Sequence, residues 1–159
     1  MKNNSSIKEQ SLNPTISGNL HLQSVPQETD PAKLDESILM ALAAAAEKKA
    51  INIVVLDLRE IASFTDYFVI ASGANERQVQ AISDEVVETL KKAGTRVNRV
   101  EGYKTAEWIL LDYGDFVMHI FNEKARAFYD LERLWRESKR VELPREFSTE
   151  QHSSLRSES

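Results

Sequence analysis

One stretch of the chain, residues 108–121 (WILLDYGDFVMHIF), constrains the possible folds more than any other. Two apolar runs flank a short polar break at residues 112–115, which contains Asp and Gly. Gly reaches positive φ without steric cost and Asp can bond its own backbone, so the break predicts a tight turn and the whole stretch a β-hairpin. The second run, residues 116–121, is apolar on both alternations except for His119, which indicates a central strand covered on both faces by helices.

Helical and strand-like segments alternate along the rest of the chain. Together with the hairpin, their order predicts an α/β domain with a mixed sheet of about five strands and helices on both faces. Only the connection through the second predicted helix is long enough to join two parallel neighbours. The predicted segments are the helices 31–49, 76–93 and 122–139 and the strands 53–58, 67–71 and 96–101.

Local signals set the ends of the first two predicted helices. Asp30 suits the N-cap of the first helix, and Pro31 suits its first position, where no N–H is needed. Asn75, followed three residues later by Gln78, has the form of a capping box. Gly94 suits a left-handed stop after the second helix. The second helix is therefore predicted with a defined signal at each end.

The last predicted helix begins at Asn122, whose side chain can cap it. Residues three and four positions apart give this helix an apolar face and exposed ion pairs, which contribute about 0.3 kcal/mol each. The apolar face is predicted from Phe128, Leu131 and Leu134 or Trp135, and the predicted ion pairs are Arg126–Asp130 and Glu132–Arg136.

Composition divides the chain into three parts. Residues 1–29 are rich in Ser, Asn, Gln and Pro, and such a segment buries too little apolar surface to offset its ordering entropy, so it is predicted to be a disordered extension. Residues 30–142 carry all the predicted elements and form the folded domain. Residues 143–159 are polar and are predicted to be a flexible C-terminal tail.

Composition also excludes several classes of function for these 159 residues. No apolar run reaches the roughly 18 residues that a membrane span needs, and the N-terminus lacks the apolar core of a secretory signal. The absence of cysteine excludes disulfides and thiolate sites and fits a cytoplasmic protein. A net charge of −5 argues against a nucleic-acid-binding protein and favours a basic protein partner.

Two short motifs could hold a ligand. Ser72-Gly73, just before the second predicted helix, could bind a phosphate at the helix N-terminus, but the motif lacks a second Gly and a following Lys-Ser or Lys-Thr, so an ordinary strand-to-helix turn is favoured. Asp112 and Asp115 could hold a divalent cation, but they flank a turn and lack an Asp-x-Asp arrangement. Turn chemistry explains both carboxylates, so we predict no metal site.

Two further polar positions have ordinary structural explanations. His119 lies inside a predicted central strand, where a lone His is usually a buried, hydrogen-bonded core residue rather than an acid–base catalyst. Thr65-Asp66 precedes a predicted strand and is interpreted as a local side-chain turn. We therefore predict no catalytic residues.

The aromatic residues near the hairpin leave two interpretations open. Trp and Tyr beside carboxylates at a turn are typical of an interface anchor. Aromatic side chains also dominate protein cores, and for Trp108 the two interpretations weigh about equally. The residues concerned are Tyr103, Trp108, Tyr113 and Trp135.

Several segments in order give the chain a resemblance to a known family. TDYFVIASG at 65–73 is followed by ERQVQAISDEV at 76–86, by EG and W ahead of LLDYGDFVMHIF at 110–121, and by FYDLERLW at 128–135. This pattern resembles the ribosomal silencing factor (Iojap-like) family over about residues 31–142. Because several segments match at natural spacing, the resemblance does not depend on a single motif.

The resemblance implies a nucleotidyltransferase-like topology without catalysis or cofactor, and the chain indeed lacks the Gly-Ser and Asp-x-Asp set of such enzymes. It implies a translational repressor that binds the large ribosomal subunit through its protein number fourteen. Occupying that face would block joining of the small subunit and lower translation under nutrient limitation. The resemblance also implies a homodimer in the cytoplasm, although family members occur in organelles as well.

Carried over by position, the resemblance implies a partner-binding surface that includes Trp108 and Tyr113, with Asp112 and Asp115 as weaker candidates. Tyr113 stands where other members have an aliphatic residue. An aromatic anchor with acidic neighbours can dock onto a basic ribosomal protein. Two alternatives remain: a nucleotidyltransferase-like enzyme that binds phosphate or a nucleotide at Ser72-Gly73, and a homodimeric scaffold for another assembly.

Overall fold

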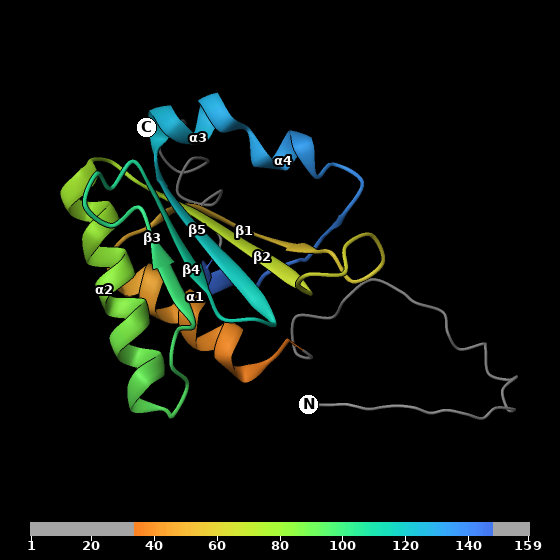
Figure 1. Ribbon diagram of the computed structural model, residues 1–159, viewed down its shortest axis with the longest axis horizontal. Coiled ribbons are helices and arrows are strands. Elements are labelled where there is room, and N and C mark those ends of the chain that lie inside the picture. Colours follow the sequence, from red (N-terminus) through yellow and green to blue (C-terminus); the bar gives the residue numbers. More distant parts are fainter. Residues whose placement is uncertain (1–33, 148–159) are drawn as a thin grey trace, which may run out of the picture.

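The structure, a computed structural model, describes residues 34–147. Its centre is a six-stranded mixed sheet in the order β3-β4-β5-β2-β1-β6 (Figure 1). The predicted α/β class is confirmed. The elements in chain order are α1 (Glu36–Glu47), β1 (Ile51–Asp57), β2 (Tyr67–Gly73), α2 (Glu76–Lys92), β3 (Arg99–Glu101), β4 (Trp108–Asp112), β5 (Phe116–Asn122), α3 (Glu123–Tyr129), α4 (Leu131–Leu134), β6 (Lys139–Arg140) and a 3-10 helix, η3 (Arg145–Phe147).

The predicted hairpin is confirmed and holds the centre of the sheet. β4 and β5 pair antiparallel, with Trp108 opposite Phe121. On its other side β5 pairs in parallel with β2, and the connection between these two strands runs through α2, as predicted. Because β5 has a neighbour on each side and helices on each face, every residue from Phe116 to Phe121 is buried.

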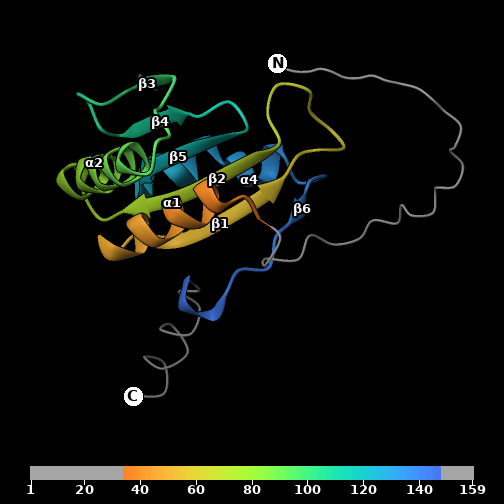
Figure 2. The same ribbon diagram turned by 90° about the horizontal axis from the view of Figure 1, so that it is seen from below.

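Two clusters of buried side chains lie on opposite faces of the sheet. Figures 1 and 2 show α1 and α2 against one face and α3 and α4 against the other. Successive side chains of a strand point to opposite faces, and β4 follows this rule. Ile109 and Leu111 belong to the cluster beneath α1 and α2, whereas Trp108 and Leu110 pack against the cluster beneath α3 and α4. We call the latter side of the sheet the α3–α4 face; its buried cluster is Leu56, Leu58, Phe68, Ile70, Val117, Phe121, Ala125 and Leu131.

Helix α1 begins later than the sequence predicts. Asp30 and Pro31 lie outside the described residues, but Asp35 has non-helical φ and ψ of −53° and 141°, and its side chain accepts a hydrogen bond from the Ser37 N–H. Asp35 therefore caps the helix, and the predicted start at residue 31 is wrong. Asp35, followed by Glu36, offers the same capping chemistry as Asp30 but lies closer to the buried residues of the helix, so the helix begins after Asp35.

The predicted ends of α2 are confirmed. The Asn75 side chain accepts a hydrogen bond from the Gln78 N–H at 2.9 Å, and Gly94 follows the helix with φ of 97°. The Gln78 amide oxygen in turn accepts from the Ala74 N–H at 2.6 Å, and its nitrogen donates to the carbonyl oxygens of Lys48 and Lys49. One side chain thereby ties the start of α2 to the end of α1.

The single helix predicted over 122–139 is wrong. Asn122 caps α3 as predicted, but Asp130 takes a left-handed conformation, with φ and ψ both 52°, and separates α3 from α4. The ion pairs differ accordingly, because the bend brings Arg126 to Glu132, at 2.7 Å, and Arg133 to Asp130, at 3.2 Å. The predicted apolar face is also partly wrong: Leu131 is buried and Trp135 packs against the same cluster, but Phe128 and Leu134 are 78% and 70% exposed.

The C-terminal residues contribute two elements that sequence patterns missed. Lys139 and Arg140 form β6, which pairs antiparallel with the end of β1 and gives the sheet its sixth strand. Phe147, in η3, is buried in the cluster beneath α1 and α2. The folded part therefore extends at least to residue 147, beyond the predicted boundary at 142. In the part of the chain from 34 to 147, no helix has the length and apolar character that crossing a membrane requires.

Candidate functional site

Trp108, the first residue of β4, is half-buried on the α3–α4 face. Its ring stacks on Phe121, with 5.0 Å between centroids, and contacts Tyr129 of α3 at 4.7 Å. Its indole N–H donates a hydrogen bond to Nδ1 of His119 at 3.1 Å. Trp108 therefore packs against the core of this face but is not fully buried, so part of the residue remains available for a partner.

Tyr113 lies beyond the other end of β4 and on the opposite side of the sheet. Its ring is stacked on Phe116, with 4.9 Å between centroids and 13° between planes, and it packs against the cluster beneath α1 and α2. Among residues 34–147 its buried hydroxyl finds no hydrogen-bond partner, and burial raises the pKa of Tyr113 to about 12. The structure thus separates Trp108 from Tyr113, so the two rings do not form one continuous aromatic surface.

Asp112 and Asp115 belong to the hairpin turn. Oδ1 of Asp112 accepts a hydrogen bond from the Gly114 N–H at 2.9 Å, and Asp112 also pairs with Arg99 of β3 at 3.6 Å. The carbonyl oxygen of Asp115 accepts from the Asp66 N–H at 3.0 Å. Within the described residues no group of three or more His, Cys, Asp or Glu side chains could hold a metal ion. The Asp112–Gly114 bond is the turn chemistry that the sequence predicts, whereas the contacts with Arg99 and Asp66 join the turn to other elements.

Thr65 and Asp66 do more than the predicted local turn. The Thr65 hydroxyl donates to the carbonyl oxygen of Gly114 at 2.8 Å, so the loop before β2 is fastened to the β4–β5 turn. Burial, together with the negative charge of Asp115, raises the pKa of Asp66 above its ordinary value. The local-turn interpretation is therefore wrong, because the polar partners lie on another element that only the folded chain brings near.

Ser72-Gly73 is explained by packing. Oγ of Ser72 is buried and accepts a hydrogen bond from the Arg126 guanidinium at 2.8 Å. A Cβ on Gly73 would lie 3.0 Å from the backbone nitrogen of Val79, so only Gly lets β2 approach α2 this closely. The two residues thus have structural partners, which favours the strand-to-helix turn over a phosphate site.

His119 is buried, as the sequence predicts for a central strand, with only 4% of its surface exposed. Burial lowers its pKa to about 3, so the ring is neutral at physiological pH. Besides the bond from Trp108, it contacts the Phe68 ring edge-to-face, with 4.4 Å between centroids. Its Nε2 has no hydrogen-bond partner within residues 34–147.

Sequence reasoning missed the exposed apolar groups around the α3–α4 face. They come from the loop after β1 and from α3 and α4, at positions outside the regular spacing of a single helix. The bend at Asp130 interrupts the regular helical spacing in 128–135, so the repeat of aromatic and aliphatic residues there was the available signal for the members on α3 and α4. The exposed members are Ile61, Phe64, Phe128, Tyr129 and Leu134.

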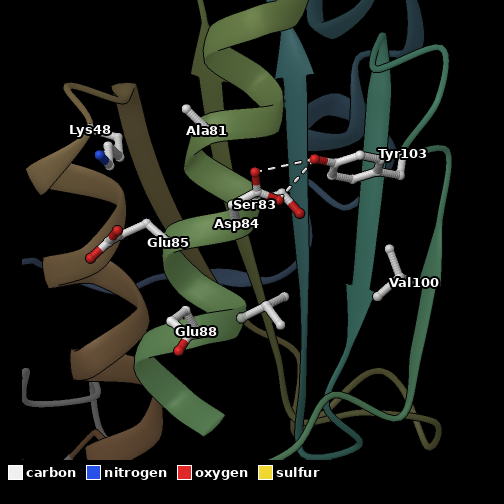
Figure 3. A pocket seen from close by; sticks show the side chains of 9 residues that line it. Lys48, Ala81, Ser83, Asp84, Glu85, Glu88, Val100 and Tyr103 are labelled. Atoms are coloured by element: carbon white, nitrogen blue, oxygen red, sulfur yellow. Dashed lines mark hydrogen bonds between the residues drawn. The ribbon is translucent and has the colours of Figure 1, made fainter. Parts of the chain in front are cut away.

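A separate groove lies beside α2 and has an acidic lining (Figure 3). It encloses about 610 Å³ between Lys48 and the β3 side of the sheet. The Tyr103 hydroxyl donates to the Asp84 carboxylate at 2.9 Å. Tyr103 therefore lines this groove and lies away from Trp108. Two more carboxylates, Glu85 and Glu88, line the groove.

Comparison with known proteins gives consistent matches over the folded part of the chain. Residues 31–159 match the family model described as "Ribosomal silencing factor during starvation". The chain is 41% identical over 108 residues to the ribosomal silencing factor RsfS of Halalkalibacterium halodurans, a match that covers 68% of this chain and 92% of the relative. It is 31% identical over 121 residues to the mouse protein named "Mitochondrial assembly of ribosomal large subunit protein 1", covering 74% of this chain and 52% of that protein.

A solved structure shows the same fold. The crystal structure of protein CV0518 from Chromobacterium violaceum superimposes with a TM-score of 0.63 at 33% sequence identity. The match covers 69% of this chain and 88% of the solved one.

Proposed function

Because the chain belongs to the ribosomal silencing factor family, we propose that it represses translation by binding the large ribosomal subunit and blocking its joining with the small subunit. The family description places the activity in starvation, and the name of the mouse relative refers to the large subunit. In this proposal the direct partner is protein number fourteen of the large subunit. The protein acts in the cytoplasm and makes or breaks no covalent bond.

The observation that carries the proposal is the half-buried Trp108 beside exposed aromatic residues of α3. Phe128 and Tyr129, on α3, lie at the same end of the α3–α4 face, and the Tyr129 ring contacts both Trp108 and Phe128. Exposed aromatic groups around a fixed, partly packed anchor are typical of the centre of a protein interface. A net charge of −5 suits a basic partner.

The other proposed contact residues lie at the hairpin turn. Asp112 and Asp115 would meet basic groups of the partner there, and Tyr113, which is packed against Phe116, would hold the turn in shape. Since Trp108 and the turn mark the two ends of β4, the proposed interface runs along this strand. Both ends of β4 must then touch the partner.

A sedimentation experiment tests the proposal. Purified large and small subunits are mixed with and without the protein and are separated on sucrose gradients, and we expect added protein to lower the yield of joined ribosomes and to sediment with the large subunit. Trp108→Ala should lose both effects, whereas Tyr103→Ala, which changes the groove beside α2, should keep them. An unchanged yield of joined ribosomes with the wild-type protein would refute the proposal.

Self-association is a separate part of the proposal. We propose that the free protein forms a homodimer, and sedimentation velocity over a range of concentrations measures this directly. A single species of the monomer mass of 18.0 kDa at all concentrations would contradict the dimer while leaving the ribosome proposal intact.

A further inference from the structure

His119 lies between Trp108 and Phe68 among the aromatic residues of the α3–α4 face. It lies on the central strand β5, opposite Leu110 of β4 and Ile70 of β2. Trp108 is its diagonal neighbour on one side and Phe68 on the other, and diagonal neighbours on one face are within reach of aromatic side chains. His119 therefore touches the rings of both adjoining strands.

The hydrogen bond from Trp108 fixes the tautomer of His119. An indole nitrogen can only donate, so Nδ1 of His119, at 3.1 Å, must be the acceptor and carries no proton. The neutral ring then carries its single proton on Nε2. Because burial lowers the pKa of His119 to about 3, the ring stays neutral and the acceptor is kept throughout the physiological range.

The neighbouring rings also fix the orientation of the imidazole. Phe68 contacts it edge-to-face, with 72° between planes, and Phe121 lies nearly parallel to it at 6.3 Å. The His119 side chain thus cannot turn without disturbing two buried rings. Its Nδ1 is held at one point on the face, and the Trp108 N–H must point to that place.

The polar ring is costly at this position. Nε2 is buried and has no hydrogen-bond partner among the described residues, and an unsatisfied buried donor destabilises the fold. An aliphatic side chain would fill the same position on β5 without that cost. The remaining contribution of the imidazole is the acceptor that it offers to Trp108.

We infer that His119 is a positioning residue, which holds the indole of Trp108 in one orientation so that its outer edge is presented to the partner. The inference rests on the proposed function for its biological meaning, because Trp108 is the proposed anchor. The physical part of the inference, that His119 fixes the orientation of the Trp108 ring, depends only on the contacts among side chains of β4, β5 and β2. A prearranged anchor loses less freedom on binding, which raises affinity without adding any contact.

Nuclear magnetic resonance tests the positioning without a partner. In the wild-type protein we expect His119 to carry its proton on Nε2 between pH 5 and pH 9, and the Trp108 indole N–H to exchange with solvent about tenfold more slowly than in His119→Phe. The Trp135 indole serves as an internal reference, and backbone amides of β5 report whether the variant is folded. A proton on Nδ1 in the wild type, or equal indole exchange in a folded His119→Phe, would overturn the inference.

A matched substitution separates positioning from packing. In His119→Asn the amide oxygen can occupy roughly the place of Nδ1, whereas in His119→Gln the acceptor lies one bond farther out. We expect Asn to restore the slow exchange of the Trp108 indole and Gln to leave it fast. Equally fast exchange in the two folded variants would overturn the inference, because an acceptor in the place of Nδ1 would then have no effect on the Trp108 indole.

Binding to large subunits supplies the functional readout. We expect folded His119→Phe to bind about tenfold more weakly than the wild type and His119→Asn to recover most of the loss. Wild-type affinity in folded His119→Phe would overturn the functional part of the inference. If the wild-type protein itself fails to bind, the proposed function falls, whereas the resonance measurements still decide whether His119 positions Trp108.

Discussion

Arg126 joins four segments of the fold, and its replacement should be the most damaging change outside the apolar core. Its guanidinium, only 12% exposed, donates to the Asn52 carbonyl at 2.7 Å and to the Ser72 hydroxyl at 2.8 Å, and it pairs with Glu132 at 2.7 Å. These contacts tie α3 to the ends of β1 and β2 and to α4. Arg126→Met keeps most of the volume and removes every donor.

The magnitude follows from these contacts. The two hydrogen bonds to neutral oxygens contribute about 1 kcal/mol each. Glu132, whose side chain is 25% exposed, loses its main partner and keeps Arg140 at 3.9 Å. After allowance for solvent, the loss of this ion pair costs about 1 kcal/mol more. We therefore expect Arg126→Met to lower the free energy of unfolding by about 3 kcal/mol.

Urea unfolding followed by circular dichroism measures this change. Arg133→Met is the matched control in the neighbouring helix, because the Arg133–Asp130 pair is 75% and 48% exposed and should contribute less than about 0.5 kcal/mol. A loss below about 1 kcal/mol for Arg126→Met, or equal losses for the two variants, would refute the reasoning.

The effect of Arg126 should depend on pH. Burial alone would raise the pKa of Glu132, but the hydrogen bond and charge of Arg126, with the charge of Arg140, lower it below its ordinary value of 4.5. A carboxyl group with a lowered folded-state pKa stabilises the protein above its unfolded-state pKa, and that contribution is lost as pH falls through the folded-state value. The difference between wild type and Arg126→Met should therefore shrink on acidification below about pH 4.5. A difference that grows in acid would contradict this assignment.

Three further substitutions have specific expected outcomes. Tyr113→Phe removes a buried hydroxyl without a partner in residues 34–147 and should raise the free energy of unfolding by about 0.5–1 kcal/mol, as measured in urea; a loss of stability would mean that the hydroxyl is satisfied. Gly102→Ala should destabilise far more than Gly94→Ala in thermal unfolding, because both have positive φ but only a Cβ at Gly102 would collide with the Trp108 carbonyl, and equal melting temperatures would contradict this contact. Trp108→Ala should weaken binding to large subunits by at least about 2 kcal/mol while the chain stays folded, and normal binding in a pull-down titration would exclude Trp108 as an anchor.

The elements that the sequence predicts well are those defined by local chemistry. The β4–β5 turn depends on Asp112 and Gly114, and the start of α2 depends on Asn75 and Gln78, so each signal lies within a few residues of its effect. The order of these elements then predicts the sheet. Local hydrogen-bonding groups thus explain most of the fold that was predictable.

The missed features depend on partners far along the chain. β6 is two exposed residues whose pairing is supplied by the end of β1, and nothing in Lys139-Arg140 signals a strand. The break at Asp130 accompanies an ion pair between Arg126 and Glu132 that becomes possible only when the helix bends. Patterns of spacing in a short window cannot register such contacts.

The candidate site was only partly predictable, although one useful signal was present. The sequence left Trp108 open between a core residue and an interface anchor, and the structure places it half-buried on the α3–α4 face. Its separation from Tyr113 was not predictable, because Tyr113 lies in the turn beyond β4, where the alternation of strand side chains no longer applies. The role of His119 as an acceptor for Trp108 required the strand register, which the sequence alone does not specify.

The place of the last described residues has a consequence for synthesis of the protein. Helix α1 and strand β1 leave the ribosome before the other described elements, yet the outer neighbour of β1 is β6, and Phe147 lies in the buried cluster with α1. A growing polypeptide therefore exposes this early sheet edge until residues 139–147 have emerged from the exit tunnel. Folding at this edge of the sheet must therefore wait for residues made about eighty positions later than β1 itself.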